Sequence, residues 1–372
     1  MRLNEESLET LVVRQMVEGR WEQGAASDYE PAYAIDLPQL TAFIEATQPD
    51  LVEALSLHEA TAERHEFLAR LQGEITRNGV VHVLRKGVDH RQHHVDFFFP
   101  TPTPGNVRAV DLFGANRFTV TRQVHYSQTD TFKSVDMALF VNGLAVATLE
   151  LKNPWTGQNV QNAVRQYRTD RDPKEPLFEF GRCLVHFAVD PDEAFMCAQL
   201  AGNDSNFLPF NKGFNYGKGN PVNPNGHKTA YLWQEILPRR SLTNIIEQFA
   251  KFTVEKDNKT GKERKALFFP RYHQLDVVRG ILADAKQNGI GQTYLIQHSA
   301  GSGKSNSITW LAYQLVELYD TAGTANVFDS VVVVTDRRVL DTQLKDNIKL
   351  FSETKNIVAH AESAAELKAH LE

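Results

Sequence analysis

One stretch decides the fold of the N-terminal half: Ser134-Val135-Asp136-Met137-Ala138-Leu139-Phe140-Val141-Asn142-Gly143-Leu144-Ala145-Val146-Ala147-Thr148-Leu149-Glu150-Leu151-Lys152. Asn-Gly between two apolar runs is a strong signal for a β-hairpin, because both residues accept the positive φ angles of a tight turn. Further strands are predicted at residues 117–126 and 183–189, and helices at residues 5–18 and 158–168. The pattern predicts an α/β fold in which helices flank a mixed sheet.

Other segments are predicted with less distinctive patterns. Residues 79–84 read as a short strand, residue 97 opens another, and residues 38–71 read as two helical pieces broken around Pro49. Residues 201–230, rich in Gly, Asn and Pro, predict an irregular connection. A short amphipathic helix is expected at 242–252, and an exposed, mobile loop at 251–265, where six basic residues surround a turn.

Residues 89–96 hold three histidines and two aspartates. Such a cluster can bind zinc or nickel, but no second ligand cluster accompanies it. A solvated polar loop is the commoner explanation, and both interpretations stay open at this point.

The predicted hairpin also carries a candidate nuclease site. Asp136, Glu150 and Lys152 follow the pattern of an acid, then an acid and a lysine two residues apart, found in metal-dependent nucleases. Two carboxylates on paired strands can hold Mg²⁺ by oxygen ligands, and the metal activates water and neutralises charge on the scissile phosphate. Glu150 and Lys152 leave the same sheet face, so the lysine can orient the nucleophile and stabilise the transition state.

Strand parity tests this hypothesis. A two-residue turn at Asn142-Gly143 alone pairs Asp136 with Leu149 and sends Glu150 to the other face. An odd offset, from a three-residue loop or a β-bulge, is required to bring Asp136 opposite Glu150. We therefore expect such an offset, and carboxylates on opposite faces would end the nuclease assignment.

A second motif lies near the C-terminus of the chain. Ser299-Ala300-Gly301-Ser302-Gly303-Lys304-Ser305 follows the apolar residues 294–296, predicted as a strand, and precedes residues 308–312, which have helical spacing. Strand, glycine-rich turn, Lys-Ser and helix form a phosphate-binding loop, in which backbone N–H groups and the helix N-terminus cradle phosphate. Lys304 would reach the β- and γ-phosphates of ATP, and Ser305 would ligate Mg²⁺. His298 occupies the place of the usual first glycine.

Composition bounds the class of protein. The chain has 372 residues, enough for two or three domains, and a net charge of −6 that argues against a globally basic nucleic-acid coat. Two cysteines are too few for a disulfide framework and suit a reducing cytoplasm. Neither a signal peptide nor a membrane-spanning run is present, so we expect a cytoplasmic protein without a membrane partner.

The order of these motifs resembles the HsdR family, the restriction subunits of type I restriction–modification enzymes. The resemblance spans most of the chain and is carried by Val135-Asp136, Asn142-Gly143-Leu144, Leu149 to Pro154, Gln166, Phe187 to Asp190, Phe207 to Gly213, Tyr231-Leu232-Trp233, Arg271 to Gln274, His298 to Ser305, Asp336-Arg337 and Leu340-Asp341.

The resemblance implies a PD-(D/E)XK nuclease domain followed by a RecA-like helicase lobe. It implies Asp136 and Glu150 as Mg²⁺ ligands, Lys152 as the catalytic lysine, and Gln274 as the residue that reads the adenine of ATP. Gln166 fits the family's Gln-x-x-x-Tyr pattern and could orient water or contact DNA, although an exposed helix glutamine is commoner. Asp170 stands where that tyrosine is expected, and Tyr167 adjoins Gln166, which leaves the tyrosine's function open. Double-stranded DNA and separate modification and specificity subunits are the implied partners.

We therefore expect a nuclease domain over residues 1–200, a connector over 201–268 and part of a first motor lobe over 269–372. No acidic pair follows Ser305 at the end of an apolar strand, apart from the weak candidate at residues 331–336, so the motor is expected to be truncated and without translocation. The function expected is Mg²⁺-dependent cleavage of duplex DNA, coupled in the intact subunit to ATP-driven translocation. The alternative is a helicase-like ATPase whose N-terminal domain only binds DNA or partner subunits.

Overall fold

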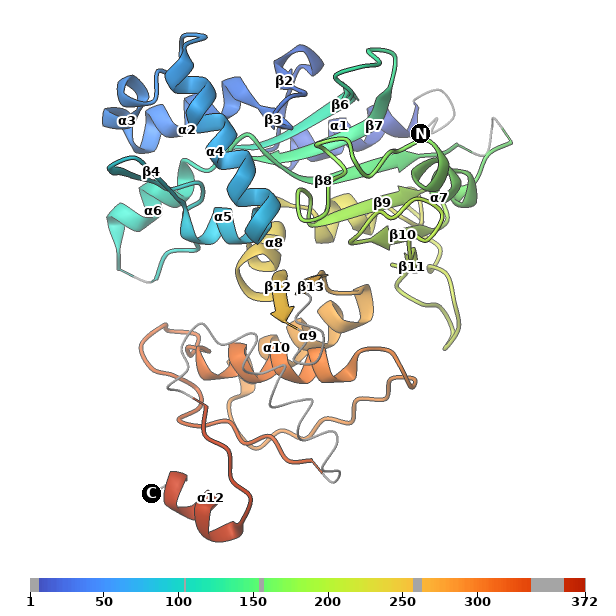
Figure 1. Cartoon of the computed structure of the whole chain (residues 1–372). Coiled ribbons are helices and arrows are strands. Elements are labelled where there is room, and N and C mark those ends of the chain that lie inside the picture. Colours follow the sequence, from blue (N-terminus) through green and yellow to red (C-terminus); the bar gives the residue numbers. More distant parts are fainter. Residues whose placement is uncertain (1–6, 104, 154–156, 257–262, 336–357, 372) are drawn as a thin grey trace. The chain divides into compact units, whose positions relative to one another are not determined.

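The computed structural model describes residues 7–103, 105–153, 157–256, 263–335 and 358–371 (Figure 1). The chain divides into two compact units, residues 1–269 and residues 270–372.

The first unit is organised around a mixed sheet, in which the described residues form nine strands. Neighbours along the main path are, in order, β1 (Glu22–Gln23), β6 (Phe118–His125), β7 (Ser134–Val141), β8 (Leu144–Leu151), β9 (Val185–Val189), β10 (Ala194–Cys197) and β11 (Leu208–Pro209). β1–β6 and β8–β9 are parallel pairs and the other pairs on this path are antiparallel. β2 (Tyr29–Glu30) pairs with β3 (Ile35–Asp36), which joins β8.

The hairpin β7–β8 has the turn that the sequence predicts and one additional residue. Asn142 and Gly143 have φ angles of 52° and 81°, and Val141 pairs with Leu144 across them. The register then shifts, because Phe140 pairs with Ala145 but Leu139 pairs with Ala147, so Val146 is a β-bulge. Met137 pairs with Leu149, and the same register continued by one residue sets Asp136 opposite Glu150. The bulge thus supplies the odd offset that the parity argument requires.

Helices flank this sheet, as expected. Those before β9 are α1 (Leu8–Glu18), α2 (Leu37–Thr47), α3 (Pro49–Ala54), α4 (Ala62–Asn78), α5 (Val80–Lys86), α6 (Val107–Gly114) and α7 (Val160–Thr169), with a 3₁₀ turn η1 (Ala26–Asp28). α7 packs on β8, β9 and β10, and α5 packs on β8 (Figure 1). Side chains of Ser7, Thr61 and Asn159 cap the N-termini of α1, α4 and α7.

Two predicted strands before β6 are wrong. Residues 79–84 form helix α5, because Gly79, with a φ of 79°, ends α4 and lets the chain begin a second helix at once. The valines of this helix are buried, so their apolar run reflects burial against the sheet rather than strand pairing. Residues 97–100 are not a strand either; the Phe97 carbonyl accepts a hydrogen bond from the Asn142 side chain at 2.8 Å.

The connector residues 201–268 belong to the first unit. They contain the π-helical segments η3 (Leu232–Ile236) and η4 (Ile245–Phe249), helix α8 (Arg239–Asn244), and the antiparallel pair β12 (Lys251–Lys256) and β13 (Glu263–Phe268). The predicted helix at 242–252 thus corresponds to the end of α8 and to η4, which follow one another without a break and end at Phe249. Residues 251–256 and 263–265 of the predicted loop are strands of a hairpin, and residues 257–262 lie outside the described residues. The Arg85 guanidinium on α5 stabilises η4 by donating hydrogen bonds to the carbonyls of Ile246, Glu247 and Ala250 at 2.7, 2.7 and 2.9 Å.

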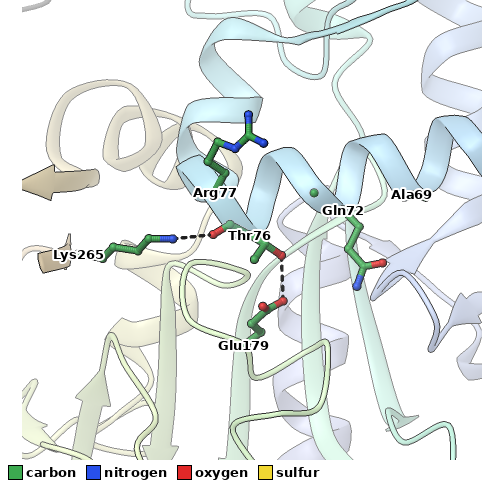
Figure 2. Close-up of a pocket in the computed structure, with 7 residues that line it drawn as sticks. Ala69, Gln72, Thr76, Arg77, Glu179 and Lys265 are labelled. Atoms are coloured by element: carbon green, nitrogen blue, oxygen red, sulfur yellow. Dashed lines mark hydrogen bonds between the residues drawn. The ribbon is translucent and has the colours of Figure 1, made fainter. Parts of the chain in front are cut away.

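A hydrogen bond also joins the β12–β13 hairpin to α4. Lys265 donates to the Thr76 carbonyl at 3.2 Å, and the Thr76 hydroxyl donates to the Glu179 carboxylate at 3.0 Å (Figure 2). These groups line an open depression of about 540 Å³ together with Ala69, Gln72, Gly73 and Arg77. None of these residues belongs to either motif that the sequence singles out.

In the second unit, the described helices are α9 (Tyr272–Asn288), α10 (Lys304–Val316) and α12 (Ala364–Leu371), with α9 and α10 packed together. The predicted strand at 294–296 is absent, as is a strand at 331–335, and the Leu295 and Val334 side chains are 93% and 85% exposed. A strand forms only where a neighbour completes its hydrogen bonds, and the described residues of this unit provide no such neighbour. Asp336-Arg337 and Leu340-Asp341 lie outside the described residues.

Candidate functional site

The three side chains predicted from the hairpin lie together. The Lys152 ammonium is 3.7 Å from Asp136 Oδ2 and 3.9 Å from Glu150 Oε2. Asp136 comes from β7, Glu150 from β8, and Lys152 directly follows β8 (Figure 1). The Lys152 backbone N–H donates to the Val189 carbonyl at 2.9 Å, which continues the parallel pairing of β8 with β9 beyond the end of the strand. Two carboxylates and one lysine therefore share one face of a rigid sheet.

Each carboxylate has one oxygen engaged by the protein. Asp136 Oδ2 accepts a hydrogen bond from the Leu151 backbone N–H at 2.8 Å. Glu150 Oε1 accepts one from Arg171 Nε at 2.7 Å, whereas Glu150 Oε2 is buried and has no hydrogen-bond partner among the described residues. A buried carboxylate oxygen without a hydrogen bond is costly, and here the Lys152 ammonium at 3.9 Å is the charge that faces it.

Burial dominates the electrostatics of Glu150. The side chain is fully buried, and this desolvation raises the pKa of its carboxyl to about 8. The neighbouring Asp136 contributes to this rise, and Arg171 and Lys152 limit it. A carboxyl with this pKa exchanges a proton near neutral pH, which is typical of groups at functional sites.

Arg171 is the member of this site that sequence reasoning missed. It follows the C-terminal end of α7 by two residues and reaches back to Glu150, 21 residues away in sequence. Its Nη1 donates to the Tyr126 hydroxyl at 3.3 Å, and its guanidinium lies 5.4 Å from the centre of the Tyr126 ring. No motif or spacing in the sequence marks Arg171 as part of the site. The sequence indicates only that a buried carboxylate would need a positively charged neighbour.

The helix after the hairpin presents a tyrosine, rather than Gln166, to the sheet. Tyr167 is fully buried, and its hydroxyl is 2.8 Å from the Thr148 hydroxyl, which in turn is 2.7 Å from His186 Nδ1. Thr148 precedes Glu150 by two residues on β8 and therefore lies on the same face. Burial lowers the pKa of His186 to about 3, so its imidazole is neutral. Gln166 is partly buried and the structure brings it to none of the three residues of the hairpin site.

The His-Asp segment at 89–96 forms a small hairpin of β4 (Val88–His90) and β5 (His93–Val95). His94 lies between two aspartates, with Nδ1 2.7 Å from Asp89 and Nε2 3.5 Å from Asp96, and these contacts raise the pKa of the half-exposed imidazole. In the described part of the chain, no group of three or more His, Cys, Asp or Glu side chains is arranged to hold a metal ion. This segment therefore forms charge pairs within a small hairpin.

The phosphate loop has the conformation that its glycines permit. Gly301 and Gly303 have φ angles of 71° and 83°, and α10 begins at Lys304. The Lys304 ammonium donates to the carbonyls of His298 and Ser299 at 3.0 and 2.9 Å. Ser305 lies in the first turn of α10, so its backbone N–H is among the groups that the helix leaves unbonded.

Gln274 shapes this loop. Its amide nitrogen donates to the carbonyls of Ser302 and Gly303 at 3.2 and 3.0 Å, and its amide oxygen accepts from the Arg271 backbone N–H at 2.9 Å. The side chain is 4% exposed. In this conformation Gln274 holds the loop, and the amide groups that would recognise an adenine are engaged by backbone.

Comparisons with known proteins match both parts of the chain. The family described as "Type I restriction enzyme R protein N terminus" matches residues 2–205, and the family described as "SWI2/SNF2 ATPase" matches residues 273–372. These matches, with the mixed sheet flanked by helices, confirm the predicted fold class. No described helix is long and apolar enough to cross a membrane.

Two curated relatives are similar over most of this chain. The type I restriction enzyme HindI endonuclease subunit of Haemophilus influenzae is 26% identical over 269 residues, which cover 68% of this chain and 23% of the relative. The putative type I restriction enzyme MjaIXP endonuclease subunit of Methanocaldococcus jannaschii is 22% identical over 285 residues, 71% of this chain and 25% of the relative. The matched region thus spans about a quarter of the length of each relative.

Proposed function

The chain belongs to the family of type I restriction enzyme R protein N termini, and from this premise we propose that it carries the metal-dependent endonuclease centre of a type I restriction enzyme. The centre consists of Asp136, Glu150 and Lys152, and its substrate is double-stranded DNA. The observation that carries the proposal is the position of the Lys152 ammonium, within 4 Å of both carboxylates on one sheet face.

The residues fit Mg²⁺ better than zinc. Mg²⁺ is usually held by one or two carboxylates and several waters, whereas zinc favours three or four nitrogen and sulfur ligands. Asp136 and Glu150 would hold the ion, and Glu150 Oε2, which has no hydrogen-bond partner among the described residues, is the oxygen of Glu150 that is free to bind it. When bound, Mg²⁺ would activate water and offset the negative charge that develops on the scissile phosphate.

Lys152 would contribute a positive charge beside the two carboxylates. Its side chain is 12% exposed, so its ammonium acts in a partly desolvated setting where electrostatic interactions are stronger than in water. It can donate a hydrogen bond to a phosphate oxygen or to the attacking water from its present position between the carboxylates. Gln166 remains a candidate for orienting water or contacting DNA from α7.

A second site would bind ATP in the second unit. Gly301, Ser302, Gly303, Lys304 and Ser305 would cradle the phosphates, with the Ser305 hydroxyl on Mg²⁺, and Gln274 would contact the adenine after its amide leaves the loop. The match to a SWI2/SNF2 ATPase supports this assignment. In the complete enzyme, ATP hydrolysis would drive DNA translocation, and modification and specificity subunits would be the protein partners.

The organisation of the chain follows from these assignments. We propose an endonuclease domain over residues 1–200, a connector over 201–268 and the first part of a motor lobe over 269–372. Cys183 and Cys197 are unpaired and buried, which suits the reducing cytoplasm, where we propose the enzyme acts.

Exchange of Asp136 for alanine in the assembled type I complex tests the proposal. Loss of one of two metal-binding carboxylates should lower DNA cleavage by roughly a thousandfold, because the ion stabilises transition-state charge by several kcal/mol. ATP hydrolysis should remain. Unchanged restriction by Asp136→Ala would instead favour a helicase-like ATPase whose N-terminal domain only binds DNA or partners.

A further inference from the structure

We propose that Arg171 is a positioning residue of the endonuclease centre: it holds Glu150 through Oε1 so that Oε2 is the oxygen offered to a divalent cation. This inference rests on the proposed function, because it assigns a role toward the ion that Asp136 and Glu150 would bind. Arg171 itself would touch neither the ion nor DNA.

The first support is the number of contacts that hold the guanidinium still. Its Nε donates to Glu150 Oε1 at 2.7 Å, its Nη1 donates to the Tyr126 hydroxyl at 3.3 Å, and its face lies against the Tyr126 ring. The Arg171 side chain is 6% exposed and that of Glu150 is fully buried. Tyr126 is itself fixed, because it is buried and its hydroxyl donates to the Asp170 carbonyl at 3.3 Å. Arg171 is thus restrained both by its ion pair with Glu150 and by its contact with the Tyr126 ring. A side chain held in this way can fix the rotamer of Glu150.

The second support is the unequal treatment of the two Glu150 oxygens. Oε1 receives the short charge-assisted hydrogen bond, and the nearest described charge to Oε2 is the Lys152 ammonium at 3.9 Å. Oε2 has no hydrogen-bond partner although it is buried. Because Asp136 faces the same ammonium, Oε2 points to the side on which both carboxylates can reach one ion. Without Arg171, nothing in the described contacts would decide which oxygen faces that side.

The geometry requires arginine and not only a positive charge. A guanidinium presents Nε and Nη donors in one plane and can also stack on an aromatic ring, whereas a lysine ammonium is a point charge on a flexible stem. Lysine at position 171 would retain the charge and lose the fixed direction of the hydrogen bond. The charge role and the positioning role therefore predict different behaviour for Arg171→Lys.

The test measures Mn²⁺ binding to the whole chain in the absence of DNA, by isothermal titration calorimetry and by electron paramagnetic resonance. Arg171→Met and Arg171→Lys should both bind Mn²⁺ about tenfold more weakly, the usual loss when a residue that orients a metal ligand is changed. Wild-type affinity in Arg171→Met would overturn the inference. Wild-type affinity in Arg171→Lys alone would also overturn it, since charge would then suffice.

Arg168→Met is the matched control. Arg168 is an α7 arginine whose guanidinium donates to the Ser205 carbonyl at 2.9 and 3.2 Å and does not contact Glu150. Its exchange disturbs the packing of α7 and should leave Mn²⁺ affinity unchanged. An equal loss in Arg168→Met would reduce Arg171 to a structural role and overturn the inference.

Three further variants separate the possible explanations of the result. Tyr126→Phe keeps the ring and removes the hydroxyl that Arg171 Nη1 contacts, so it should weaken Mn²⁺ binding by less than tenfold. This variant tests the proposal even if the Arg171 variants do not fold. Wild-type affinity for Mn²⁺ in Tyr126→Phe would contradict the proposal. Glu150→Gln and Asp136→Asn should abolish Mn²⁺ binding. If these two variants bind as wild type, the proposed function itself fails, whereas their loss of binding beside an unchanged Arg171→Met removes only the inference about Arg171.

Discussion

The carboxylate centre of the first unit draws its side chains from β7, β8 and the segment after α7, whereas the phosphate loop of the second unit draws on seven consecutive residues. In the first, side chains neutralise one another: Arg171 and Lys152 face Glu150 and Asp136. In the second, Lys304 is held by backbone carbonyls, and the loop's shape comes from glycine φ angles and the Gln274 amide.

This difference decides how each site responds to change. A loop of consecutive residues has most of its geometry from local backbone preference, so its motif is recognisable wherever it occurs. The carboxylate centre exists only while a sheet register and a distant arginine hold it, so it is sensitive to changes that leave its three motif residues intact.

The largest expected difference between the two sites comes from exchanging their lysines separately. Lys152→Ala should lower DNA cleavage by the assembled complex by about a hundredfold or more, as for the loss of one preorganised charge at a transition state. Lys304→Ala should weaken ATP binding by roughly ten- to a hundredfold, since hydrogen bonds to charged groups contribute about 1.5–3 kcal/mol.

Each variant is the control of the other. Lys152→Ala should bind ATP normally, and Lys304→Ala should bind Mn²⁺ at the carboxylate centre normally. A loss of ATP binding in Lys152→Ala would break the separation of the two sites on which the comparison depends.

An effect of intermediate size is expected in the pH dependence of Mn²⁺ binding, which concerns the carboxylate centre alone. Because burial raises the pKa of Glu150 to about 8, an ion that binds the carboxylate must displace a proton below that pH. Affinity for Mn²⁺ should therefore fall as the pH is lowered below 8, by roughly tenfold per pH unit for one proton released, and become level above it. Calorimetry in buffers of different ionisation enthalpy would count the released proton, and a flat profile from pH 6 to pH 8 would contradict the prediction.

The smallest expected effect compares Gly143 with Gly303. Both have positive φ angles, so alanine should destabilise each local structure by about 1–2 kcal/mol. A Cβ on Gly143 would lie 2.5 Å from the Asp36 carbonyl oxygen, which cannot withdraw because the Asp36 N–H donates to the Gly143 carbonyl. A Cβ on Gly303 would meet the end of the flexible Gln274 side chain at 2.3 Å, which can turn aside by giving up its hydrogen bonds to Ser302 and Gly303, whereas backbone at Gly143 cannot move in this way.

Gly143→Ala should thus destabilise the β7–β8 hairpin by about 1 kcal/mol more than Gly303→Ala destabilises the α9–α10 pair, beyond the shared penalty of positive φ. Hydrogen exchange of the amides in each element measures the two opening free energies separately. Equal losses would show that the turn tolerates movement as well as the loop does.

Sequence reasoning located much of this fold correctly. The bounds of β7 and β8 agree with the prediction because Asn142-Gly143 is an unambiguous turn, and α7 and α10 follow their helical spacing. The strand prediction for residues 79–84 is wrong because a run of valines is equally suited to a strand and to a buried helix. The loop prediction for residues 251–265 is wrong for the described strands β12 and β13, because charged residues are typical of loops, whereas here a hairpin forms and Lys265 donates a hydrogen bond to α4.

The candidate site is likewise predictable from the sequence only in part. Asp136, Glu150 and Lys152 could be named from spacing and chemistry, and parity required an odd offset between the strands. Its source could not be predicted, because a bulge at Val146 reflects the packing of a whole sheet rather than the residue itself.

By itself, the sequence determined the turn, the phosphate loop and the residue types of both candidate sites, because these depend on φ preferences and on chemistry within a few consecutive residues. Only the tertiary structure decided that Asp136 lies opposite Glu150, that Arg171 returns to Glu150, and that Gln274 binds the phosphate loop. These contacts join residues between 14 and 29 positions apart, and burial in the folded unit, where an unpaired charge or polar group is costly, selects them.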